Sequence, residues 1–365
     1  MKKFLFLLAL GATTPAWSPA FAGQQTTETP TNAVLTPDAA PFRWQLHLRA
    51  GQKFLITTDT SSESSQEMPS MPGRDQPGAA FSMNNKSQAH MVIEENVLSS
   101  DDTGARVEVI YRDMTQSSVM RQGDKVIYDS AHPPDAMKGS GDTLKGMVGA
   151  RLSFRLSPQG QISDIQGVKE YLNHLNQGIE KAFGQTPQAK AQQKAMREML
   201  GTLMSPEVLQ ESFGAAYRVM PTAPVALGGS WNYAVVTPIM GTTFTQKGQS
   251  TFVSRAGGLV TIANKGELST NGGAEFKVPG LAAGTAKTPA PISQLDLHGT
   301  SKGDATVDEA TGLTIQSRMT QNMEGDLVMS GLMGAGSELT IPMKIKDETI
   351  SRMEEVKATP CLSAS

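Results

Sequence analysis

Apolar and polar residues alternate along most of this chain, which is the pattern of a β-strand with one buried face. The clearest run is 151–156, where Leu152, Phe154 and Leu156 are the apolar members. Similar runs with short connections occur before and after a central segment, and they predict an antiparallel sheet. The expected strands cover residues 42–49, 52–60, 87–98, 105–115, 118–122, 125–128, 151–156, 161–165, 231–237, 243–247, 251–254, 259–268, 293–299, 303–308, 313–323 and 337–350.

The central segment has the spacing of helices instead. From residue 168 to 183, large apolar residues recur every three or four positions and form one stripe on a helix: Val168, Leu172, Leu175, Ile179 and Phe183. Thr186-Pro187 is a typical helix start, and it predicts a second helix to about residue 203. Ser205-Pro206 repeats that signal for a short third helix. A stripe of this size needs a sheet to cover it, because the entropy lost on ordering offsets most of the burial gain.

These elements predict an α+β fold that is mainly antiparallel β. We expect a long curled or half-closed sheet in two halves, wrapped around or lidded by a central helical pair. The predicted single domain covers 41–352, with a first β half at 41–166, a helical segment at 167–215 and a second β half at 216–352. Residues 61–85, rich in Ser, Met, Pro and Gly, and residues 269–291 are expected to be loops, and 353–365 a flexible tail.

The first residues indicate where the protein is located. Lys2 and Lys3 precede a short apolar run at 4–10, and Ala20-Phe21-Ala22 is a typical cleavage site, so residues 1–22 predict a Sec signal peptide. We therefore expect a bacterial periplasmic or secreted protein, with a disordered linker at 23–40. The run is too short to span a bilayer, and no other segment is long and apolar enough, so no transmembrane segment is predicted. The single cysteine excludes an internal disulfide.

Charge and motifs argue against several classes of function. The formal net charge is −3, and no basic patch indicates a nucleic-acid partner. The five histidines lack the spacing of metal ligands. Residues 299–303 read Gly-Thr-Ser-Lys-Gly, the spelling of a nucleophile elbow, but the residues after them predict no helix, so a polar hairpin turn is expected. No phosphate loop occurs. The sequence predicts a non-enzymatic protein without a cofactor.

One segment of the second half carries a family resemblance. Residues 220–225 read Met-Pro-Thr-Ala-Pro-Val, and residues 228–231 read Gly-Gly-Ser-Trp. This segment resembles a family of bacterial secreted proteins known only as a domain of unknown function, with the pattern L-P-x-x-P-V-x-x-G-x-x-W. The matching positions are Pro221, Pro224, Val225, Gly228 and Trp231, whereas Met220 stands where the family usually has leucine. The resemblance implies no catalytic residues.

Methionine is frequent, with 20 residues, and its flexible side chain suits the lining of an apolar cavity. The first hypothesis is therefore an envelope protein that binds an apolar ligand, such as a lipid or a lipoprotein acyl chain. Its predicted lining is Leu172, Leu175, Ile179, Phe183, Met196, Met199, Leu200 and Trp231. One alternative is a structural or protein-interaction module with a packed core. Another is weak Cu(I) binding by soft ligands in a methionine-rich loop, namely Met68, Met71 and Met83 with His90. The ligand and the oligomeric state stay open.

Overall fold

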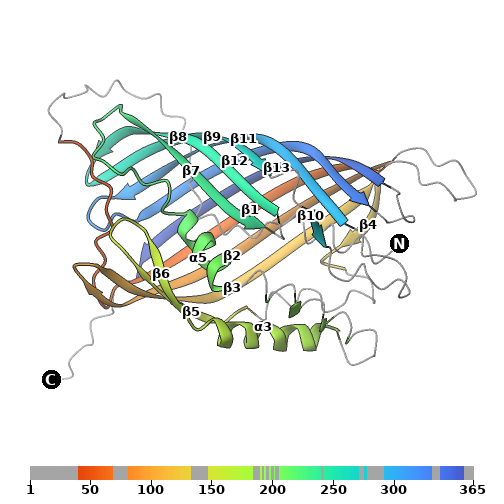
Figure 1. Ribbon diagram of the computed structural model, residues 1–365, viewed down its shortest axis with the longest axis horizontal. Helices are drawn as coiled ribbons and strands as arrows, with labels where there is room; N and C mark the ends of the chain where they lie inside the picture. Colours follow the sequence, from red (N-terminus) through yellow and green to blue (C-terminus); the bar gives the residue numbers. More distant parts are fainter. Residues whose placement is uncertain are drawn as a thin grey trace, which may run out of the picture.

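The computed structural model describes residues 40–68, 81–132, 147–183, 205–239, 242–270, 275–277, 292–330 and 338–356, with a few positions between 190 and 201. The described strands form one 13-stranded sheet in which every pairing is antiparallel, as expected (Figure 1). The strands are β1 (Lys53–Met68), β2 (Phe81–Asp101), β3 (Gly104–Gln122), β4 (Lys125–Asp129), β5 (Arg151–Leu156), β6 (Ile162–Gln166), β7 (Ser230–Ile239), β8 (Thr242–Ala256), β9 (Leu259–Thr270), β10 (Glu275–Lys277), β11 (Ile292–Asp308), β12 (Thr314–Ser330) and β13 (Glu338–Glu355). The described helices with full bounds are α3 (Val168–Phe183) and α5 (Pro206–Ala215).

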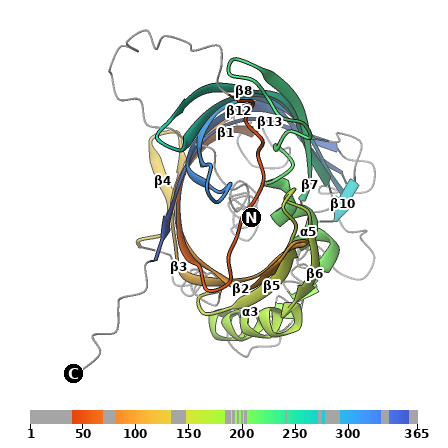
Figure 2. The same ribbon diagram turned by 90° about the vertical axis from the view of Figure 1, so that its left-hand side faces the viewer.

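The two halves of the chain join in the middle of the sheet. The strand order is β6-β5-β3-β2-β1-β13-β12-β11-β9-β8-β7, with β4 beside β3 and β10 beside β11. Along this path, only β1 and β13 pair across the length of the chain, from Phe54 opposite Glu355 to Gln66 opposite Met343. The sheet curls until its edges β6 and β7 approach each other, but these two strands do not pair, so the sheet is not closed (Figure 2).

Helix α5 lies between the two edges, and helix α3 lies beside β5 (Figure 2). Helix α5 packs against both β6 and β7, and α3 contacts β5. Helix α3 buries Tyr171, Leu175 and Ile179, and the ring of Tyr171 lies 5.8 Å from that of Tyr111. Helix α5 begins as predicted, because the Ser205 hydroxyl accepts a hydrogen bond from the backbone N–H of Val208. The helix expected at 187–203 lies largely outside the described residues, so the helical pair stays a prediction.

Several expected boundaries were wrong, in β1 and β11 because the inward residues there are polar or glycine. Residues 61–68 and 81–85 were assigned to a loop but extend β1 and β2. The inward positions of this part of β1 are Ser62, Ser64 and Gln66, so no apolar alternation marks the strand. Residues 299–303 were expected to form a turn but lie inside β11, opposite residues 319–323 of β12. Residues 353–355, predicted to be a flexible tail, belong to β13.

Residues 41–50 have the burial of a strand without a neighbouring strand. Phe42, Trp44 and Leu46 are buried, as their alternation predicts, but the segment makes only one β-bridge, between Phe42 and Val225. The indole N–H of Trp44 donates to the carbonyl of Gly312 at 2.8 Å. Figure 2 shows this segment, in red, crossing one end of the curled sheet. We call this end the sealed end.

Candidate functional site

The inner face of the curled sheet changes character along the strands. Successive residues of a strand point to opposite faces, and directly paired residues share a face, so the register assigns each side chain to a side. Near the sealed end the inner residues are apolar and aromatic. They form one buried cluster around Tyr111 and Phe154 and a second around Phe252 and Val260.

A methionine-rich apolar cluster occupies the other end of the inner face, near β4 and β10 (Figure 1). It draws on seven strands, and its members are all 9% exposed or less. We call it the methionine cluster: Met68, Met83, Met120, Met323, Met329 and Met343, with Leu268, Leu297, Leu327, Leu339, Ile341 and Ile345. Gln66 of β1 pairs with Met83 on one side and Met343 on the other, so the register brings methionines of different strands to one level of the sheet.

Between these zones the inner face is polar. We call this zone the polar belt: Ser62, Ser64, Gln66, Asn85, Ser87, Ser118, Gln246, Ser250, Asn264, Ser301, Ser317 and Asp347, all buried. Some members hydrogen-bond to each other across strands. The Ser118 hydroxyl donates to Asn85 Oδ1 at 2.7 Å, and the Ser250 hydroxyl donates to Asn264 Oδ1 at 2.6 Å. These bonds offset part of the cost of burying polar groups.

Tyr233 lies across the polar belt above two glycines. Its hydroxyl accepts a hydrogen bond from Gln246 Nε2 at 3.0 Å. A Cβ atom at Gly248 would come within 2.5 Å of the Tyr233 hydroxyl oxygen, and one at Gly266 within 3.2 Å. Only glycine at these two positions leaves room for the ring, so the local sequence places a phenol among the serines of the belt.

Asp347 is the acidic member of the polar belt. It is 7% exposed, pairs with Ser62 on β1 and accepts a hydrogen bond from the Ser62 hydroxyl. Burial raises the pKa of Asp347 to about 6. Burial also raises the pKa of Glu95, which faces inward near the sealed end, to about 7. Among the described residues, the buried polar side chains include no Lys or Arg. The titratable groups buried on the inner face are therefore acidic.

Four of the eight side chains predicted to line an apolar site are described, and two of these lie in different clusters. Leu175 belongs to the cluster around Tyr111, whereas Trp231 packs against the cluster around Phe252 and donates its indole N–H to the Val219 carbonyl at 2.7 Å. Leu172 is half-buried and Ile179 is fully buried. The side chains of Phe183, Met196, Met199 and Leu200 lie outside the described part of the structure.

The predicted copper ligands are also separated. Met68 and Met83 are both members of the methionine cluster, and Met71 lies outside the described residues. His90 points to the outer face, where its Nδ1 lies 2.7 Å from Asp59 Oδ1. His90 therefore cannot complete a site with Met68 and Met83, and that assignment was wrong. Within the described ranges, no group of three or more His, Cys, Asp or Glu side chains could hold a metal ion.

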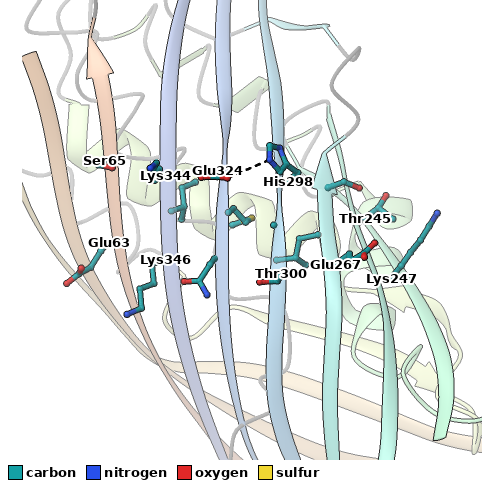
Figure 3. A pocket seen from close by; sticks show the side chains of 16 residues that line it. Glu63, Ser65, Thr245, Lys247, Glu267, His298, Thr300, Glu324, Lys344 and Lys346 are labelled. Atoms are coloured by element: carbon teal, nitrogen blue, oxygen red, sulfur yellow. Dashed lines mark ion pairs between the residues drawn. The ribbon is translucent and has the colours of Figure 1, made fainter. Parts of the chain in front are cut away.

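The outer face carries a shallow groove of about 970 Å³ across β1, β13, β12, β11, β9 and β8. Figure 3 shows most of its labelled side chains in two rows that run across the strands. Opposite charges face each other across strands, as in the pairs Lys346 with Glu63 and Glu267 with Lys247. His298 Nε2 lies 3.9 Å from Glu324 Oε1. This alternation of opposite charges is the pattern of a solvated sheet face.

Comparison with known proteins gives a family. Residues 102–314 match the model of a family of unknown function (DUF6263). The chain belongs to this family. The DUF6263 match extends from the turn after β2 to the first residue of β12, and it includes the proline-rich segment before Trp231. The expected membership of a family of unknown function is confirmed.

Other comparisons add no function. A search of curated protein sequences finds no match. Among solved structures, lipovitellin, studied for its lipid–protein interactions, aligns with 86% of this chain at 8% identity and a TM-score of 0.40. The chain spans only 26% of the lipovitellin chain. An outer membrane channel from Pseudomonas putida F1 aligns over 87% of this chain and 100% of its own, at 6% identity and a TM-score of 0.19. Similarity this low supports no conclusion about fold or ligand.

Helices that could span a membrane were also sought. None of the helices in the described ranges combines the length and the apolar composition that a bilayer span requires.

Proposed function

We propose that this DUF6263 member is an exported, non-enzymatic protein of the bacterial envelope that binds an apolar ligand, such as the acyl chain of a lipid or lipoprotein. The observation that carries the proposal is the methionine cluster. It places 12 apolar side chains on the inner face of seven strands, at the end away from the segment of residues 41–50. The predicted signal peptide supports export.

The composition of the methionine cluster suits a flexible hydrocarbon chain. Methionine is unbranched and adapts its shape, so a surface rich in it can repack around ligands of different length. Each methylene group removed from water contributes about 0.8 kcal/mol. An acyl chain with about ten buried methylenes would therefore gain roughly 8 kcal/mol before the cost of ordering it. After that cost is subtracted, binding between the millimolar and micromolar range is within reach.

The first test is whether a ligand accompanies the protein. We expect native mass spectrometry of the protein, purified without detergent from a bacterial envelope fraction, to show an adduct with the mass of a lipid. We also expect 12- to 16-carbon amphiphiles to raise its melting temperature. A protein free of adducts whose melting temperature does not respond to any of them is instead the packed interaction module.

A pair of variants locates the site. Met343→Gln keeps the length of the side chain but places an amide in the methionine cluster, and we expect at least about tenfold weaker acyl-chain binding. Val253→Gln makes a similar polar change at an exposed position of β8 that is 49% accessible, and binding should stay unchanged. Equal loss in both variants would place the ligand elsewhere.

A further inference from the structure

Within the described part of the structure, five buried polar atoms of the polar belt have no hydrogen-bond partner. They are Ser64 Oγ, Gln66 Oε1, Asn264 Nδ2, Ser317 Oγ and Asp347 Oδ1. Their residues are each 7% exposed or less. A buried polar atom without a partner costs about 1–3 kcal/mol, so a group of five on one inner face indicates that something else meets them.

The polar belt and the methionine cluster are continuous. Along β1, Ser62, Ser64 and Gln66 occupy successive inward positions. Ser62 lies opposite Asp347 of the polar belt. Ser64 lies opposite Ile345 and Gln66 opposite Met343, and both of these partners belong to the methionine cluster. An elongated ligand with its hydrocarbon part among the methionines would place its other end at the polar belt.

Four of the five unpartnered atoms can accept a hydrogen bond. The Asp347 carboxylate oxygen and the Gln66 carbonyl oxygen accept, the two serine hydroxyls do both, and only the Asn264 amide is restricted to donating. No Lys or Arg belongs to the buried polar side chains of the described residues. A ligand carboxylate or phosphate would therefore meet acceptors and a buried acid without a cation to balance it.

We propose that the polar belt binds the head group of an amphiphile that donates hydrogen bonds, a hydroxyl-bearing or amine-bearing group, with Asp347 as its main acceptor. This inference rests on the proposed function, because the acyl chain of the same ligand occupies the methionine cluster. It adds the class of ligand, which is an alcohol or amine amphiphile and not a free fatty acid. Asp347 recognises the head group, and the methionines accept the chain regardless of its head.

The test compares three ligands with the same chain of 12 carbons, below their micelle concentrations at pH 7.5: 1-monododecanoylglycerol, dodecylamine and dodecanoate. Dissociation constants are measured by isothermal titration calorimetry with the full mature chain. We expect the dissociation constants of the glycerol ester and the amine to be at least about tenfold lower than that of dodecanoate. In Asp347→Asn, the preference for the amine over dodecanoate should fall by at least about tenfold, because the carboxylate charge is gone.

Asp296→Asn, an exposed change on the outer side of β11, is the matched control and should keep the preferences of the wild type. Circular dichroism verifies that each variant is folded, and Ser64→Ala, next to Asp347 on the side of the methionine cluster, serves as a second belt variant that should weaken the glycerol ester in particular. Equal binding of all three ligands, with no effect of Asp347→Asn, overturns the head-group assignment and leaves the acyl-chain site standing. Binding of none of them to the wild type rejects the proposed function itself and indicates that water fills the belt.

Discussion

Asp347 lies where little water reaches it, so its ionisation affects the stability of the fold. Its pKa is raised to about 6 from an ordinary value of 3.8, which means that the folded protein holds this proton more tightly than the unfolded chain. The contribution of Asp347 to stability therefore decreases as the pH rises from about 4 to about 6, and stays low at higher pH.

Replacing Asp347 with Asn should remove this pH dependence. We expect Asp347→Asn to raise the free energy of unfolding at pH 8 by about 3 kcal/mol, and to change it little at pH 4, where the folded wild type is protonated. Urea denaturation at the two pH values measures the difference. Asp326→Asn, exposed on the outer side of β12, is the control. A gain of the same size at both pH values would contradict this account of Asp347.

At the scale of single residues, the sequence alone identified part of the methionine cluster. Met68 and Met83 were named as candidates, but with copper as the ligand and His90 as a partner, because a face of a strand cannot be assigned before its register is known. Asp347 was not identified, since a lone aspartate between lysine and glutamate resembles a solvated position. A signal existed: Leu339, Ile341, Met343 and Ile345 alternate strictly, and Asp347 occupies the next position of the same period.

Among the elements, α5 shows how a local signal determines structure. Its predicted start at Ser205-Pro206 is confirmed, because capping depends only on the residues of the first turn. The strands interrupted by glycine were not predicted correctly. Gly299 and Gly303 were interpreted as ends of strands, but a Cβ atom at either would lie about 2 Å from a backbone oxygen of β12 (2.0 Å and 2.1 Å). These glycines mark a close approach of two paired strands, which the sequence of one strand does not reveal.

Removal of the α5 cap should be measurable. We expect Ser205→Ala to lower the free energy of unfolding by about 1 kcal/mol, because the N–H of Val208 loses its acceptor. Ser205→Asp, which keeps an acceptor at the same position, should keep most of the stability. Urea denaturation of the two variants separates loss of the cap from a general effect of substitution. Equal destabilisation by both would show that the cap is not the cause.

At the scale of the molecule, the pairing of β1 with β13 joins the first half of the chain to the second. The alternation in each strand predicted that both exist, but it carries no information on which strand is the neighbour. The tolerance of the sheet to proline distinguishes its centre from its edge. β1 pairs on both sides, whereas β7 pairs only with β8 and already contains Pro238.

Two proline variants test this arrangement. We expect Thr60→Pro in β1 to lower the free energy of unfolding by about 3 kcal/mol or more, because any position in a central strand bonds to one of its neighbours. Val236→Pro in β7 should have a much smaller effect, since Val236 lies two positions before Pro238 and its N–H points to the same side, away from β8. Comparable losses in the two variants would contradict β7 as the edge.

The central claim is that an acyl chain lies among the inward methionines. The most direct measurement is photo-crosslinking with a 12-carbon amphiphile that carries a diazirine near the end of its chain, followed by peptide mass spectrometry. We predict labels at Met68, Met83, Met120 or Met343 that disappear when an excess of unlabelled amphiphile is added. Labels confined to outward residues such as Lys344 and His298, or labels that the competitor does not reduce, would contradict the account.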